Sequence, residues 1–68
     1  MTIELKAPTG KFRVIGVDTF DGTDWIEKDC DTLNEARQLM MDSTKGKDML
    51  KMHVYDDGGN HLDSAGRF

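Results

Sequence analysis

Three aspartates spaced three residues apart are the first candidates for chemistry in this chain: Asp18, Asp21 and Asp24. Carboxylate oxygens are the ligands that Ca²⁺ and Mg²⁺ prefer. A calcium loop, however, places its ligands at alternate positions, a glycine at the sixth position and a bidentate Glu at the twelfth. Counted from Asp18, the twelfth position is Asp29, an aspartate. The pattern therefore favours hairpin-turn chemistry, and binding of a small ligand or a divalent cation at residues 18–24 is the alternative hypothesis.

Softer metal ligands and nucleophiles are few and scattered. Cys30, His53 and His61 are the only cysteine and histidines, and no CxxC or HxxxH pair is present. Zinc would need all three and a fourth ligand, so we predict no metal site and no cofactor. Cys30 precedes a helix start, where a thiol can be activated, but it shares a strand face with Ile26 and is interpreted as a core residue. No residue stands out as catalytic, and we predict that the chain is not an enzyme.

Length and charge narrow the classes of function further. A chain of 68 residues forms one domain, and a domain of about this size buries only about 60% of its unfolded surface. This leaves little room for a deep active site. The net charge is −4, and residues 18–31 hold six acidic side chains against one lysine. Because nucleic-acid binding depends on neutralising phosphates with Lys and Arg, we predict no nucleic-acid partner.

The cellular setting is inferred from cysteine content and hydropathy. A single cysteine allows no disulfide framework, which indicates a reducing compartment. Residues 1–10 lack the apolar run of a signal peptide. No stretch approaches the roughly 20 apolar residues of a membrane span. We therefore expect an acidic cytoplasmic protein with no membrane partner.

Two strands are expected in the first half of the chain. Residues 11–18 are rich in Phe, Val and Ile and have apolar groups on both faces, which predicts a central strand. Residues 23–30 predict a second strand, and the Asp21-Gly22 pair between them suits a hairpin turn.

The second half predicts a helix and another hairpin. Residues 32–35, TLNE, match the capping box that begins a helix, and Gly46 is placed to end it. Residues 49–56 alternate as a third strand. A Gly- and Asn-containing turn at residues 56–60 then returns the chain to a short fourth strand at residues 61–65.

The predicted fold class is α+β, a single β-β-α-β-β domain with an antiparallel sheet and one helix packed on one face. The domain spans residues 11–65. Residues 1–10 form a flexible or strand-forming N-terminal arm, and residues 66–68 form a frayed C-terminus.

The runs FRVIGVDTFDGTDW (12–25), DTLNEA (31–36) and MHVYDDGGN (52–60) resemble a group of short bacterial hypothetical proteins. These share a strand, an Asp-rich hairpin, a "DTLEEA"-like helix start and a "VYDD-G" hairpin, and the similarity covers roughly residues 11–62. The resemblance implies the fold and no known activity, so no site residue follows from it.

The orientation of the sheet decides which side chains the helix leaves uncovered. Leu50, Met52 and Val54 form the uniformly apolar face of the third strand, so they are expected to point toward the helix. We expect three residues of the first two strands to join them: Ile15, Val17 and Ile26.

Five side chains then fall on the opposite, uncovered face: Phe12, Val14, Trp25, His53 and Tyr55. Aromatic residues are enriched in protein interfaces. The leading hypothesis is therefore a small protein-interaction module that binds an unknown protein partner or forms a homodimer through this face. The alternative is that residues 1–9 fold over the face, with Ile3 and Leu5 as plugs.

Overall fold

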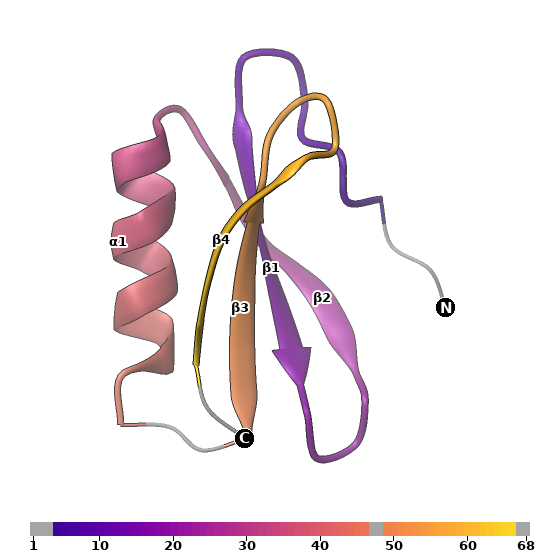
Figure 1. The fold of residues 1–68 in the computed structure, drawn as a ribbon, viewed down its shortest axis with the longest axis vertical. Coiled ribbons are helices and arrows are strands. Elements are labelled where there is room, and N and C mark those ends of the chain that lie inside the picture. Colours follow the sequence, from indigo (N-terminus) through magenta and orange to yellow (C-terminus); the bar gives the residue numbers. More distant parts are fainter. Residues whose placement is uncertain (1–3, 47–48, 67–68) are drawn as a thin grey trace.

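The computed structural model describes residues 4–46 and 49–66. They form a four-stranded antiparallel sheet with strand order β2-β1-β3-β4, and one helix packs against one of its faces (Figure 1). The predicted α+β class and element order are confirmed. The elements are β1 (Phe12–Asp18), β2 (Asp24–Cys30), α1 (Leu33–Thr44), β3 (Leu50–Tyr55) and β4 (His61–Gly66).

The helix begins and ends where local chemistry predicts. The Thr32 hydroxyl accepts a hydrogen bond from the backbone N–H of Glu35 at 3.1 Å, and the Glu35 carboxylate lies 3.2 Å from the same hydroxyl. This arrangement satisfies a backbone donor that would otherwise lack a partner at the first turn. The helix ends at Thr44, and Gly46 then adopts a φ of 71°, a left-handed conformation that favours glycine.

The core lies between α1 and the sheet. Met52 and Val54 are fully buried there, and Leu50 is half-buried against the same cluster, so the orientation predicted for β3 is confirmed. The buried members of this core are Val14, Cys30, Ala36, Met40, Met52 and Val54.

The orientation predicted for β1 is wrong. Val14 pairs directly with Val54, and directly opposed residues of antiparallel strands point to the same face. Val14 and Phe12 therefore pack on the helix side, while Ile15 and Val17 point away from the helix. Both faces of this strand are apolar, so its own residues could not decide between them; the pairing with β3 decides.

A β-bulge in β2 makes the prediction for Ile26 wrong as well. Val14 pairs with Lys28 but Ile15 pairs with Ile26, which leaves Glu27 as an extra residue. One extra residue reverses the alternation of side chains along the rest of the strand. Ile26 consequently lies on the face opposite α1, with 41% of its surface exposed.

The same bulge places Trp25 on the helix side of the sheet, opposite to its expected side. Trp25 pairs with Gly16, and its indole ring occupies the space where a side chain at that position would stand. A Cβ added to Gly16 would come within 2.7 Å of Nε1 of Trp25 and closer still to two ring carbons. Nε1 donates a hydrogen bond to the carboxylate of Glu27 at 2.9 Å.

Candidate functional site

The sheet face turned away from α1 is the candidate site, and we call it the open face. Strand pairing defines its members, because paired residues share a face. Its side chains come from all four strands: Arg13, Ile15, Val17, Asp24, Ile26, Asp29, Lys51, His53, Tyr55, His61 and Ser64.

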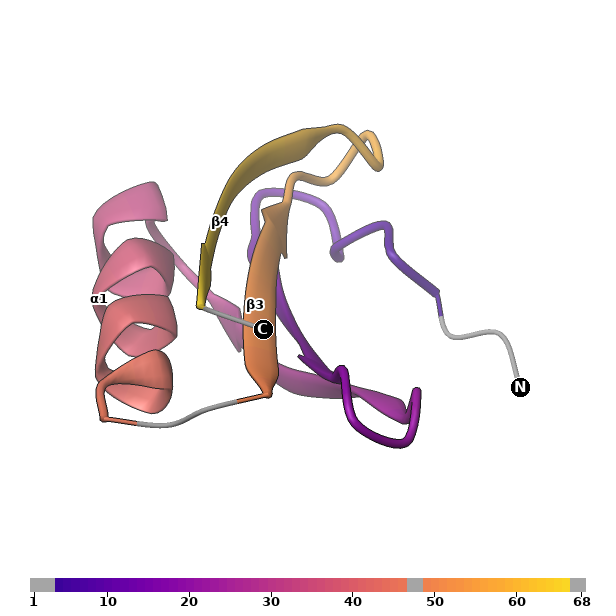
Figure 2. The ribbon, with the colours of Figure 1, turned by 60° about the horizontal axis from the view of Figure 1, so that its bottom comes forward.

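The described part of the N-terminal arm, residues 4–10, runs along the open-face side of the sheet, away from α1 (Figure 2). The N–H of Ala7 donates to the carbonyl of Asp56 at 3.0 Å, and the N–H of Gly10 donates to the Asp57 carboxylate at 3.0 Å. Ala7 is 4% exposed. The arm is therefore attached to the β3–β4 turn, and residues 4–11 contain no strand.

The arm covers only part of the open face. Ile15 points away from α1 but is only 2% exposed, so this part of the open face is covered by other residues of the chain. Leu5, expected as a plug, is instead 38% exposed, and Ile3 lies outside the described residues.

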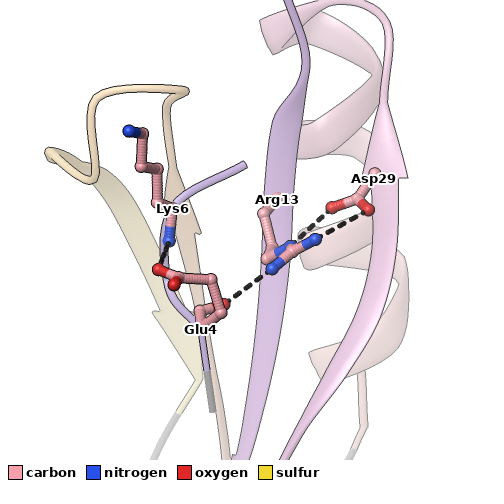
Figure 3. Close-up of polar contacts among 4 residues, drawn as sticks. All are labelled: Glu4, Lys6, Arg13 and Asp29. Atoms are coloured by element: carbon pink, nitrogen blue, oxygen red, sulfur yellow. Dashed lines mark hydrogen bonds and ion pairs between the residues drawn. The ribbon is translucent and has the colours of Figure 1, made fainter. Parts of the chain in front are cut away.

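Arg13 ties the arm and two strands together (Figure 3). Its Nε and Nη2 donate to the two carboxylate oxygens of Asp29 at 2.7 and 3.1 Å, and its Nη1 donates to the carbonyl of Glu4 at 2.7 Å. The paired guanidinium lowers the pKa of the Asp29 carboxyl below its usual value. Two-point pairing of this kind is a strong, directional contact. Arg13 therefore stabilises the fold, and its charge is paired with that of Asp29.

Three rings from β3 and β4 gather on the open face, and we call them the ring cluster: His53, Tyr55 and His61. The ring centroids of His53 and His61 lie 5.2 Å apart, those of Tyr55 and His61 5.3 Å, and those of His53 and Tyr55 6.4 Å. The first two pairs meet edge to face, a favourable arrangement for aromatic rings. His61 is exposed and the other two rings are half-buried, so the cluster keeps a face toward solvent.

The two histidines of the ring cluster share a hydrogen bond. Nδ1 of His53 lies 3.1 Å from Nε2 of His61. Burial lowers the pKa of His53 below its ordinary value of 6.5, and the nearby charges of His61 and Lys51 lower it further. His53 is therefore uncharged at neutral pH, and one nitrogen of the pair donates while the other accepts.

Two of the three aspartates considered as cation ligands, Asp18 and Asp21, accept hydrogen bonds within the β1–β2 turn, whereas Asp24 is exposed at the start of β2. The Asp18 carboxylate accepts from the N–H of Phe20 at 2.9 Å. The Asp21 carboxylate accepts from both the N–H and the hydroxyl of Thr23, at 2.9 and 2.6 Å, and these bonds lower its pKa. Such contacts are the turn chemistry that the sequence predicts. Across residues 4–46 and 49–66, no group of three or more His, Cys, Asp or Glu residues could hold a metal ion.

Cys30 lies in the core on the helix side and is 3% exposed, as its interpretation as a core residue predicts. Burial raises the pKa of its thiol, which keeps the thiol protonated and poorly nucleophilic. It borders a hollow of about 300 Å³ between β2 and α1. The hollow is lined by Lys28, Cys30, Glu35, Gln38, Leu39 and Asp42.

Of the five side chains predicted on the uncovered face, the structure brings His53 and Tyr55 together there. Phe12, Val14 and Trp25 lie on the other side of the sheet. Sequence reasoning did not include His61 in the site. A signal for it existed, because a turn at residues 56–60 places His61 directly opposite Tyr55.

No helix in the part of the chain that the structure describes is long and apolar enough to cross a membrane. Comparison with protein-family models, with characterised proteins and with solved structures finds no match for this chain.

Proposed function

We propose that this domain is a protein-binding module and that its contact surface is the part of the open face centred on the ring cluster. One observation carries the proposal: His53, Tyr55 and His61 stand within 6.4 Å of one another on a face that α1 does not cover. Tyrosine and other aromatic side chains are enriched in the centres of protein interfaces, where they contribute contact area at a low entropic cost.

Charge favours a protein over a nucleic acid as the partner. The chain carries a net charge of −4. Arg13, the open-face arginine, is already paired with Asp29 and the arm. Stacking of bases on aromatic rings normally requires Lys and Arg to neutralise the phosphates alongside.

The size of the surface indicates how the partner binds. A standard interface buries about 800 Å² on each partner, which is roughly a fifth of the 4427 Å² surface of this domain. Three rings cannot supply that area alone, so the contact extends onto β4. This strand lies at the sheet edge, and Leu62 at its bulge is 37% exposed. An extended segment of the partner beside β4 would pair with its backbone and reach the rings.

The same face is not proposed as a catalytic site. The two histidines are hydrogen-bonded to each other, and the carboxylates of Asp18 and Asp21 accept hydrogen bonds within their own turn. We infer that binding rather than catalysis is the activity of this chain.

Site-directed photo-crosslinking in the native cells tests the proposal. A photoreactive phenylalanine analogue replaces Tyr55 in one variant and Phe20 in a matched control. Phe20 lies in the β1–β2 turn and is 82% exposed. We expect a discrete crosslinked species from position 55 that is lost when His61→Ala is added, and none from position 20. Equal crosslinking at both positions, or none at position 55, would contradict the proposal. If the crosslinked species has the mass of a dimer, the partner is a second copy of the chain. Sedimentation of the purified domain then checks whether it dimerises by itself.

A further inference from the structure

We propose that His53 and His61 form a two-imidazole chelate for a divalent late first-row transition ion, Cu²⁺, Ni²⁺ or Zn²⁺. The observation is the approach of two ring nitrogens, Nδ1 of His53 and Nε2 of His61, to 3.1 Å across the β3–β4 pair. The chelate uses only these two side chains, so it does not depend on the proposed function.

The separation of the two nitrogens fits a shared ion. Zn–N bonds are about 2.0–2.1 Å long. Two such bonds at an angle of roughly 90–110° place their nitrogens about 2.9–3.4 Å apart. The observed 3.1 Å falls within this range. An ion can therefore take the position between the rings after small side-chain rotations and without a change in strand register.

The positions of the two histidines are set by the backbone. Tyr55 pairs with His61 and His53 pairs with Ser64, so the two histidines stand diagonally on adjacent strands. A bulge between the pairs of Val54 and Tyr55 shifts β4 at this point, and bulges commonly redirect a side chain. Because both residues belong to paired strands, the two ligands are held in place before an ion arrives, which lowers the entropic cost of binding.

The protonation state also suits a metal. A histidine binds an ion through a neutral ring nitrogen, and the hydrogen bond between the two histidines requires one of the two facing nitrogens to be unprotonated. In the metal-free pair a single proton lies between the two facing nitrogens. On binding, that proton moves to the outward nitrogen of the same ring, so each ring coordinates through one nitrogen and keeps its proton on the other.

The ligand set indicates the class of ion. Imidazole nitrogen suits Cu²⁺, Ni²⁺ and Zn²⁺, whereas Ca²⁺ and Mg²⁺ require oxygen ligands. In the described portion of the chain, no third His, Cys, Asp or Glu completes the set. Water therefore fills the remaining positions, and the order of affinity follows Cu²⁺ above Ni²⁺ and Zn²⁺.

A Zn²⁺ titration of tag-free protein at pH 7.5, followed by calorimetry, tests the chelate. Loss of a residue that merely supports a ligand typically weakens metal affinity about 10–100-fold. We therefore expect His61→Asn and His53→Gln each to weaken Zn²⁺ binding at least about tenfold. Asp24→Asn is the matched control, since it removes an exposed carboxylate on β2, at the opposite edge of the sheet from β4, and it should leave the affinity unchanged.

Paramagnetic broadening by substoichiometric Cu²⁺ locates the ion. We expect loss of the ring signals of His53, Tyr55 and His61, while the indole N–H of Trp25, on the far side of the sheet, stays sharp. Absence of binding up to about 1 mM Zn²⁺ would overturn the proposal. Binding that neither histidine substitution weakens, or broadening that reaches Trp25 first, would overturn it as well.

Discussion

Replacing Gly16 with alanine tests the packing of Trp25 against the sheet. The added methyl group would lie within 2.7 Å of Nε1 of Trp25, where real Cβ atoms are not found, so the indole must move. Inserting a methyl group into a well-packed site typically costs about 1–3 kcal/mol. Alanine in place of glycine within a strand offsets about 0.5–1 kcal/mol of that cost. We expect Gly16→Ala to lower the free energy of unfolding by about 0.5–2 kcal/mol.

A double-mutant cycle separates this contact from other effects of the substitution. In a Trp25→Ala background the clash is gone, so Gly16→Ala should stabilise the domain by about 0.5–1 kcal/mol. Urea unfolding followed by far-ultraviolet circular dichroism suits all four proteins, because it does not rely on tryptophan fluorescence. If Gly16→Ala has the same effect in both backgrounds, the indole does not lie over Gly16, and Trp25 does not stand on the helix side of β2.

Three further predictions address the helix, the arm and the ring cluster. Thr32→Ala should cost about 1 kcal/mol in urea unfolding, because it removes the cap of α1, whereas Thr32→Ser should restore most of it. Arg13→Met should free the arm, and amide exchange at Ala7 should accelerate while Met52 stays protected; unchanged exchange at Ala7 would argue against the clamp. Because the folded-state pKa of His53 is depressed, the stability it contributes is complete above its ordinary pKa of 6.5 and is lost as the pH falls from there through its folded pKa. In thermal unfolding at acidic pH, a His53→Gln variant should not show this loss of stability. If its stability depends on pH as that of the wild type does, His53 is not the group responsible.

Local sequence signals predict the elements well because each depends on neighbouring residues. The alternation of Leu50, Met52 and Val54 predicts which side of β3 meets the helix, and the structure confirms it. The Thr32–Glu35 capping box marks the beginning of α1 to the residue. These patterns are governed by periodicity and by backbone hydrogen bonds within one or two turns.

The face assignments of β1 and β2 failed for a different reason. Phe12 and Val14 are no more apolar than Ile15 and Val17, so only pairing with β3 decides their side. In β2 the bulge at Glu27 reverses the alternation, and a bulge arises from the fit between strands rather than from one strand alone.

The site was predictable only in part. The alternation of side chains along β3 predicts that His53 and Tyr55 lie on the face opposite Met52 and Val54. The turn predicted at residues 56–60 already places His61 opposite Tyr55, but the approach of its ring to His53 depends on the bulge in β4, which the sequence does not specify. Burial of Ala7, a residue of the arm, depends on long-range hydrogen bonds from the arm to the β3–β4 turn, which no local pattern encodes.

The ring cluster stands on the face of the sheet that α1 does not cover, and both proposals depend on this placement. Nuclear Overhauser contacts between side chains measure it directly. We predict contacts from the ring of His61 to the rings of His53 and Tyr55, and none from these rings to the methyl groups of Leu39 and Met40. Contacts from Tyr55 or His53 to Met40 would show the opposite orientation of β3 and would contradict the placement of the ring cluster.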